Sequence, residues 1–192
     1  GNIYFELKEY DKAIKCYKSS IKINNNFIDA HYNLGKIYQN LDKYAESIKC
    51  YKKAININPN FVKAHNNLGN IYGELKKFKE AIESLNQVIK IDPNYAEAHY
   101  NLGNVLRETS KDREAYLSYK KAIKINPNFT KALNNLGNIY LDLEDNQNAI
   151  SCYKKVIKLN NHDIKAYNNL GKVLQKQNQH SEAEKCFKKA IK

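Results

Sequence analysis

The sequence predicts an all-α protein, a right-handed superhelical solenoid of antiparallel helix pairs. The first observation behind this prediction is a 34-residue spacing of glycine, which six of the seven glycines keep. The second is that leucine, alanine and aromatic residues keep the same step, and the third is that each repeat holds two apolar stripes at helical spacing. The glycines in register are Gly1, Gly35, Gly69, Gly103, Gly137 and Gly171.

The other registers show that the repeat involves whole units and not glycine alone. A leucine precedes each glycine from the second onward, an alanine lies four residues before that leucine, and prolines mark several joins. An aromatic residue recurs in the second half of each unit, with a leucine in one place. These positions are Leu34, Leu68, Leu102, Leu136 and Leu170; Ala30, Ala64, Ala98, Ala132 and Ala166; Tyr17, Tyr51, Leu85, Tyr119, Tyr153 and Phe187; and Pro59, Pro93 and Pro127.

Within one unit, apolar residues at helical spacing run first from Ala30 to Leu41 and then from Ile48 to Ile55. A short polar turn separates the two stripes, so each unit reads as a helical hairpin. At the joins, proline ends the second helix and Asn60 is expected to cap the next first helix. Asn26 to Asp29 and Asn94 to Glu97 have the spacing of a capping box.

These registers resemble the tetratricopeptide repeat over the whole chain. The resemblance implies a single array, residues 1–192, with no internal domain boundary. Because the chain lacks methionine and starts within a first helix, we expect it to be a piece of a longer protein. The expected full repeats are 28–61, 62–95, 96–129 and 130–163, with partial repeats 1–27 and 164–192.

The repeat is less apolar at the helix-turn corners of the last units. Leu41 and Leu75 correspond to Thr109 and Gln177 in two later units. The aromatic side chain that begins the second helix is also lost, so we expect the C-terminal third to be less stable. Tyr44 and Phe78 at that position correspond to Asp112, Asn146 and His180.

An unbroken register of asparagine runs along the polar stripe of the first helices, which in tetratricopeptide proteins lines the concave groove. Asparagine is a poor helix former, so its repetition calls for a reason. A carboxamide can both donate to and accept from a peptide backbone, and we expect an extended peptide to bind here. The alternative is an internal hydrogen bond to the neighbouring unit. The candidate groove residues are Asn33, Asn67, Asn101, Asn135 and Asn169, with Asn70, Asn104, Asn138, Lys36, Lys63 and Lys131 beside them.

The segments Ala64–Asn70 and Ala132–Asn138 resemble the repeat arm of the O-linked N-acetylglucosamine transferases. That resemblance implies a substrate-recognition arm whose asparagine ladder receives protein substrates, with catalysis in a separate glycosyltransferase domain. The alternative is a scaffold of a multi-subunit assembly with no linked enzyme. In either case we expect a protein or peptide partner and no catalytic activity in this chain.

The net charge of +12 raises a further alternative. Lysines concentrate on the outer face of the second helices and could contact nucleic acid or an acidic surface. The interleaved aromatic and arginine residues of single-strand binders are missing, which favours a solvated lysine face. No apolar run approaches the roughly 20 residues that a membrane span needs.

Nothing in the sequence points to a cofactor, a metal or an active site. His31, His65 and His99 share one register, but units stack about 10 Å apart, too far for one zinc ion to bridge. We therefore expect these histidines to pack and not to bind metal. The cysteines have no zinc-like spacing and indicate an intracellular protein, cytoplasmic or nuclear, with free thiols. They are Cys16, Cys50, Cys152 and Cys186.

Apolar residues at both ends of the chain lack a neighbouring unit. An uncovered apolar stripe promotes association, so we expect end-to-end pairing between copies of the chain. These residues are Ile3, Tyr4 and Leu7 at the N-terminal end, and Ala183, Phe187, Ala190 and Ile191 at the C-terminal end.

Overall fold

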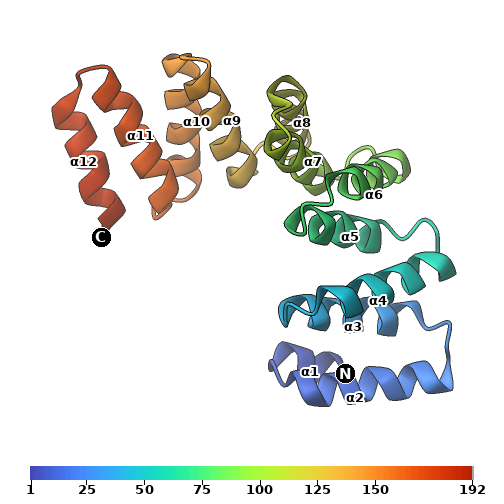
Figure 1. Cartoon of the computed structure of the whole chain (residues 1–192). Helices are drawn as coiled ribbons and strands as arrows, with labels where there is room; N and C mark the ends of the chain where they lie inside the picture. The colour runs from blue at the N-terminus through green and yellow to red at the C-terminus, as the bar shows by residue number, and fades with distance from the viewer. Residues whose placement is uncertain (192) are drawn as a thin grey trace. The chain divides into compact units, whose positions relative to one another are not determined.

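The computed structural model describes residues 1–191, which form twelve α-helices and no strand (Figure 1). The predicted all-α class is therefore confirmed. The helices fall into two compact units, Gly1–Pro93 and Asn94–Lys192, and each unit is described by itself.

The N-terminal unit holds three consecutive helix pairs. The two helices of each pair lie side by side, and the second helix of one pair also contacts the first helix of the next (Figure 1). The helices are α1 (Asn2–Glu6), α2 (Tyr10–Ile23), α3 (Ile28–Asn40), α4 (Tyr44–Ile57), α5 (Val62–Glu74) and α6 (Phe78–Ile91).

The C-terminal unit repeats this arrangement with three more pairs. Its second helices, α8 and α10, again contact both the first helix of their own pair and that of the next pair. The helices are α7 (Ala96–Glu108), α8 (Asp112–Ile125), α9 (Thr130–Asp142), α10 (Asn146–Leu159), α11 (Ile164–Lys176) and α12 (His180–Ile191).

The closest approach within each pair lies at the recurring glycine. A Cβ atom added at Gly35 would lie 2.7 Å from Cε1 of Tyr51, and one added at Gly103 would lie 2.6 Å from Cε1 of Tyr119. Both tyrosine rings are fully buried, so they have little room to move aside. The glycine is therefore needed because it lets the second-helix ring lie directly against the first-helix backbone.

The turn inside each hairpin uses a left-handed residue that the sequence did not reveal. At the α3–α4 turn, Asp42 has a φ of 55°, its N–H donates to the carbonyl of Gln39, and the N–H of Lys43 donates to the carbonyl of Tyr38. This pair of bonds is a Schellman motif, which normally favours glycine at the left-handed position. The equivalent residues are Lys8, Lys76, Ser110, Glu144 and Asn178.

The expected asparagine caps at the joins are wrong. The N-cap of α5 is Phe61, whose side chain cannot accept a hydrogen bond, and the N–H of Asn60 instead donates to Oδ1 of Asn58 at 3.0 Å. The asparagine whose side chain accepts a hydrogen bond at this join is thus Asn58, which closes the turn after α4. The N-caps of α3 and α7 are likewise the aromatic residues Phe27 and Tyr95, so neither capping box forms.

The expectation that α12 presents an apolar stripe to a missing neighbour is only partly right. Ala183 and Ala190 are buried, with 3% and 8% of their surfaces exposed. Phe187 is half-buried, and its ring lies against the backbone of Gly171 on α11. These side chains face the partner helix because α12 completes a hairpin with α11. Only Ile191 of this group is well exposed.

We expect Gly103→Ala to lower the free energy of unfolding by about 1–3 kcal/mol, as overpacking in a core does. The matched control is Gly73→Ala, which lies on α5 outside the repeating register and is half-buried. There the higher helix propensity of alanine should leave stability unchanged or raise it by up to about 1 kcal/mol. Urea unfolding followed by circular dichroism measures both, and equal effects in the two variants would contradict this explanation.

Candidate functional site

The predicted asparagine ladder lies on the first helices, and each of its members is half-buried. Its geometry is clearest at Asn135 on α9. Nδ2 of Asn135 donates to Oδ1 of Asn104 on α7 at 2.9 Å and to the hydroxyl of Tyr119 on α8 at 3.3 Å. The Tyr119 hydroxyl in turn donates to Oδ1 of Asn104 at 2.8 Å. Three side chains from three helices thus form a closed triangle of hydrogen bonds.

The same arrangement recurs at the next pair. Nδ2 of Asn169 donates to Oδ1 of Asn138 at 3.0 Å, and the hydroxyl of Tyr153 donates to the same oxygen at 2.7 Å. In the N-terminal unit, Asn33 donates to Oδ1 of Asn2 at a longer 3.4 Å. The Asn104 and Asn138 register therefore supplies the acceptors that receive the ladder amides.

Asn67 shows what happens where this acceptor is missing. Lys36 occupies the position that Asn104 holds relative to Asn135, and Nδ2 of Asn67 donates to the hydroxyls of Tyr51 at 3.1 Å and Tyr32 at 3.3 Å. Nζ of Lys36 instead lies 4.6 Å from the centroid of the Phe5 ring, as a cation–π contact. Lys36 is therefore already held by an aromatic ring of its own chain.

These bonds leave one half of each carboxamide available. The amide donors of Asn33, Asn67, Asn135 and Asn169 bond within the chain. Among the described residues, no donor contacts the Oδ1 atoms of these four asparagines. We name these oxygens the Asn face of each unit, which is Asn33 and Asn67 in the N-terminal unit and Asn135 and Asn169 in the C-terminal unit. These oxygens can accept hydrogen bonds from a ligand. The amide groups of the same side chains bond within the chain, as the alternative of an internal hydrogen bond to the neighbouring unit expects.

The tyrosine hydroxyls are part of this network, although the sequence pattern indicated only a recurring aromatic residue at their positions. Burial raises the pKa of Tyr119 to about 12, and it also raises the pKa of Tyr51 and Tyr153. The hydroxyls therefore stay protonated and can donate at physiological pH. A constant separation of 16 residues, from Tyr51 to Asn67 and from Tyr119 to Asn135, is the sequence signal that could have revealed the pairing.

An ion pair joins two first helices of the C-terminal unit. A guanidinium nitrogen of Arg107 on α7 contacts a carboxylate oxygen of Asp142 on α9. The sequence did not predict this pair, whose residues are separated by 35 positions. Lys63 and Lys131, two of the predicted groove residues, are exposed near the starts of α5 and α9.

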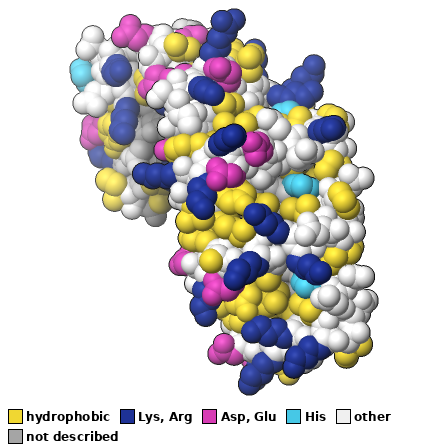
Figure 2. Space-filling model, turned by 45° about the vertical axis from the view of Figure 1, so that its right-hand side comes forward, with side chains coloured by type: hydrophobic (Ala, Val, Ile, Leu, Met, Phe, Trp, Pro, Cys, Tyr) yellow, Lys and Arg dark blue, Asp and Glu magenta, His cyan; other side chains and the backbone are white. Residues whose placement is uncertain are grey.

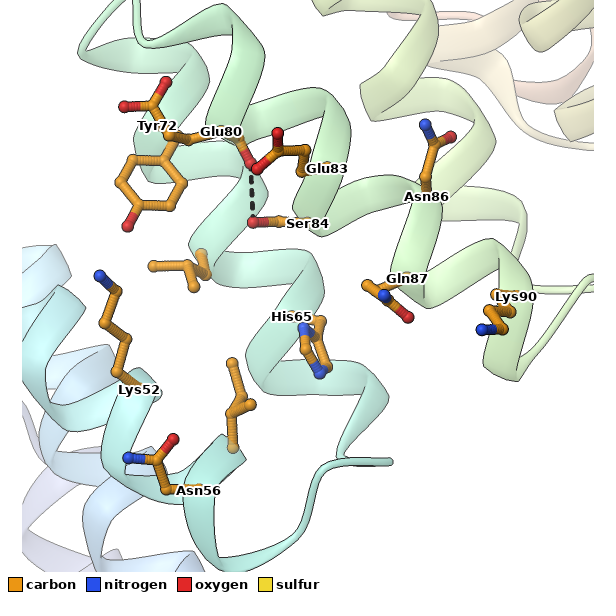
Figure 3. Close-up of a pocket in the computed structure, with 12 residues that line it drawn as sticks. Lys52, Asn56, His65, Tyr72, Glu80, Glu83, Ser84, Asn86, Gln87 and Lys90 are labelled. Carbon is orange, nitrogen blue, oxygen red and sulfur yellow. Dashed lines mark hydrogen bonds between the residues drawn. The ribbon is translucent and has the colours of Figure 1, made fainter.

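The second helices border hollows of their own. One of about 800 Å³ lies among α4, α5 and α6, with Lys52 on α4, His65 on α5 and Lys90 on α6 around it (Figure 3). Nε2 of His65 lies 2.9 Å from the carbonyl oxygen of Pro59, and since a carbonyl only accepts, the ring nitrogen donates. His31 makes the same 2.9 Å bond to the join before it, through the carbonyl of Asn25. This histidine register therefore fastens the first helices to the preceding joins.

A smaller hollow of about 420 Å³ lies between α2 and α4, above Leu34 of α3. Four lysines border it. On the face shown in Figure 2, basic side chains are spread between apolar patches and do not form one stripe. The lysines are Lys18, Lys22, Lys49 and Lys53.

The cysteines and histidines give no sign of a reactive centre. All four thiols are free, and burial raises the pKa of Cys50 and Cys152 to about 11, which keeps them protonated. Among residues 1–191, no three potential metal ligands come together. Within the same range, no helix is long and apolar enough to cross a membrane.

We expect Asn135→Ala to lower the free energy of unfolding by about 1–2 kcal/mol, because it removes two hydrogen bonds and leaves the Tyr119 hydroxyl with one partner fewer. Helix propensity alone predicts the opposite sign, a gain of roughly half a kcal/mol. Asn148→Ala on α10 would be a poor control because Asn148 bonds to Asp145. Asn86→Ala, at an exposed second-helix position, is the better one. Chemical denaturation that shows Asn135→Ala to be stabilising would refute the structural role.

Comparisons with known proteins agree on the kind of repeat. A model described as "TPR repeat" matches residues 1–42 and 69–110. Models described as "Tetratricopeptide repeat" match residues 28–61 and 96–129, 129–192, and 50–83. The comparison with curated protein sequences gives no match.

Solved structures give the same answer. A crystal structure of MamA is 30% identical, with 82% of this chain and 92% of that chain covered and a TM-score of 0.73. PilF of Pseudomonas aeruginosa is 22% identical, with 85% and 75% covered and a TM-score of 0.80. YrrB, described as a TPR protein with an unusual peptide-binding site, is 20% identical, with 91% and 90% covered and a TM-score of 0.70. With its 34-residue hairpins, its glycine–ring contacts and these matches, the chain belongs to the tetratricopeptide repeat family.

Proposed function

We propose that this chain is a non-catalytic scaffold that binds an extended segment of another protein along the Asn face. The unbonded Oδ1 atoms of Asn33 and Asn67 in one unit, and of Asn135 and Asn169 in the other, are the observation that carries the proposal. These oxygens can accept hydrogen bonds from backbone N–H groups, which every residue type except proline offers. Such a face recognises the backbone more than the side chains, and so accepts many sequences.

The spacing of the repeats suits an extended chain. Stacked helix pairs are about 10 Å apart, and a peptide in the extended polyproline II conformation rises about 3.1 Å per residue with three residues per turn, so that every third N–H points to the same side. One asparagine oxygen would therefore meet about every third backbone N–H. The amides of the same asparagines are bonded within the chain, so the oxygens are held in place before the ligand arrives, which reduces the entropy lost on binding.

The finer proposal follows from the resemblance of Ala64–Asn70 and Ala132–Asn138 to the repeat arm of the O-linked N-acetylglucosamine transferases. In that case the bound segment is a substrate delivered to a glycosyltransferase domain of the same protein. The peptide-binding site described for YrrB supports the coarser idea that a related scaffold binds peptides. A scaffold without a linked enzyme remains the competing proposal.

The binding test uses peptides selected from a random phage-displayed library on the whole chain. We expect the quadruple variant Asn33→Ala, Asn67→Ala, Asn135→Ala and Asn169→Ala to weaken the selected peptide at least fivefold. Two bonds of about 0.5–1.5 kcal/mol each are lost in whichever unit binds the peptide, and they give at least that factor. Fluorescence anisotropy measures the affinity, at a temperature where circular dichroism shows the variant to be folded.

Two controls separate backbone recognition from general damage. Asn56→Ala with Asn86→Ala, on exposed second-helix positions, should leave affinity unchanged. Methylation of alternate backbone nitrogens in the peptide should weaken binding to the unchanged protein. A quadruple variant that binds as tightly as the original chain would refute the Asn face as the binding surface.

The basic second-helix face makes a different prediction. If Lys18, Lys22, Lys49 and Lys53 contact phosphates, a single-stranded oligonucleotide should bind with an affinity that falls steeply with salt. We expect only weak binding, since the flexible side chains of these lysines lack aromatic stacking partners. A steep salt dependence together with sub-micromolar affinity at 150 mM salt would make nucleic acid the better candidate.

We also propose that copies of this chain associate weakly through the exposed apolar residues of α1 and its C-cap. Ile3 and Leu7 are 75% and 62% exposed, and such side chains promote association. Sedimentation velocity over a hundredfold concentration range should show a rising sedimentation coefficient, which Ile3→Lys with Leu7→Lys should abolish. A profile that stays monomeric at the highest concentration contradicts this.

A further inference from the structure

The corner between α8 and α9 differs from the corresponding corners of the N-terminal unit. There, an aromatic residue begins the second helix and packs toward the next first helix. Tyr10 belongs to the apolar cluster that also includes Tyr38 and Leu41. The α8–α9 corner has Asp112 at this position, and its carboxylate is exposed. An aromatic ring is therefore missing from this corner.

The missing ring leaves a hollow of about 550 Å³. Ile139 at its base is buried, whereas Leu143, the equivalent of the half-buried Leu41, is 67% exposed. The hollow thus combines an apolar wall with acidic groups. Its lining residues are Asp112, Arg113, Tyr116, Ile139, Tyr140, Asp142, Leu143 and Asp145.

Two tyrosine rings form one side of the hollow. Tyr116 and Tyr140 meet edge to face, with centroids 5.8 Å apart and an interplanar angle of 83°, and their hydroxyls are 3.4 Å apart. The hydrogen bond to Tyr116 and burial raise the pKa of Tyr140, so that it remains uncharged. Nζ of Lys120 lies 5.2 Å from the centroid of Tyr116, which shows a cation of the chain itself resting on one of these rings.

The charge of the lining favours a cation. Of the three carboxylates, Asp142 is paired with Arg107, and Asp145 accepts from the backbone and side-chain nitrogens of Asn148 at 3.2 and 2.7 Å. No described group bonds to the Asp112 carboxylate. Arg113 is the one cation among the lining residues, and Lys120 lies at the edge of the hollow, over the Tyr116 ring. The carboxylate that is left for a ligand is therefore that of Asp112.

We propose that this hollow, the Asp112 pocket, binds a lysine side chain of a protein partner. The aliphatic stem of lysine would cover Leu143 and Ile139, while its ammonium group would meet the Asp112 carboxylate and the tyrosine rings. A purely apolar side chain would desolvate the carboxylates without compensation, which is costly. The proposal does not depend on peptide binding at the Asn face, since the lining residues are different.

The test is a nuclear magnetic resonance titration of the ¹⁵N-labelled whole chain with two short peptides. The first is acetyl-Gly-Lys-Gly-amide, and the second replaces lysine with norleucine, which keeps the stem and removes the charge. We expect the lysine peptide to shift the amide signals of Asp112, Tyr116, Tyr140 and Leu143 with millimolar affinity. The norleucine peptide should bind at least fivefold more weakly. Equal affinity for the two peptides would overturn the proposal.

Matched variants locate the site. Asp112→Phe restores the ring that the chain uses at Phe78, and it should abolish the shifts and raise the melting temperature, because it fills the hollow. Asn146→Phe makes the same change one repeat later and should leave lysine binding intact. Asp112→Asn keeps the shape and should weaken binding at least threefold, which decides the question if the phenylalanine variant fails to fold. Lysine binding that survives both Asp112 variants would refute the pocket.

Discussion

The close contact between the recurring glycine and the ring opposite it determines much of this structure. Without a Cβ at Gly103, the ring of Tyr119 reaches across the first helix, and its hydroxyl arrives within 2.8 Å of Asn104 Oδ1. A bulkier residue would hold the two helices apart and withdraw that hydroxyl. The contact therefore does more than pack a hairpin, since it delivers a polar atom to the face where the next repeat is attached.

That polar atom explains why asparagine is retained where it disfavours the helix. Oδ1 of Asn104 accepts from both Tyr119 and Asn135, so one oxygen joins a hairpin to its successor. At Asn67 the register lacks this oxygen, and the amide turns to two tyrosine hydroxyls instead. Asn67 therefore forms internal hydrogen bonds even though Lys36 replaces the usual acceptor. This indicates that an amide at the ladder position stabilises the structure independently of any ligand.

The structural and the binding roles of the ladder are therefore not alternatives. A carboxamide has separate donor and acceptor atoms, and the chain uses the donor to hold the side chain still. A fixed acceptor loses less entropy on binding than a freely rotating one. The internal bond can thus contribute to recognition through the orientation it imposes on the oxygen.

The sequence predicted well what depends on periodicity and poorly what depends on local geometry. The apolar stripe from Ala30 to Leu41 lies in α3 and its C-cap, and the stripe from Ile48 to Ile55 lies in α4, because burying one face of a helix requires that spacing. The left-handed Asp42 was missed because its register holds no glycine in any hairpin and changes from one unit to the next. Asn60 was misplaced as a cap because the joins offer several polar side chains at adjacent positions.

The same difference between periodicity and local geometry applies to the candidate site. The Asn33 to Asn169 register could be read directly, whereas the partners of its amides come from other repeats. Whether an amide 31 residues away from an acceptor meets it depends on how the helices are stacked, and the sequence of one unit does not contain that information. The Arg107–Asp142 ion pair was missed for the same reason.

Positions where one repeat differs from the others can give a binding specificity that identical repeats cannot give. A face made of the same asparagine in every unit offers a ligand the same contact at each step, so by itself it cannot distinguish one register of a bound chain from a register shifted by one repeat. At the α8–α9 corner, one aromatic residue has become Asp112, and its hollow is lined by Tyr116 and Tyr140. The sequence predicts only weaker packing from this loss, because a missing contact is visible in a repeat alignment while the space that it opens is not. In a repeat protein, such a place combines lower local stability with a surface that differs from the other units. It is there that a partner can be recognised by a particular side chain and not only by its backbone.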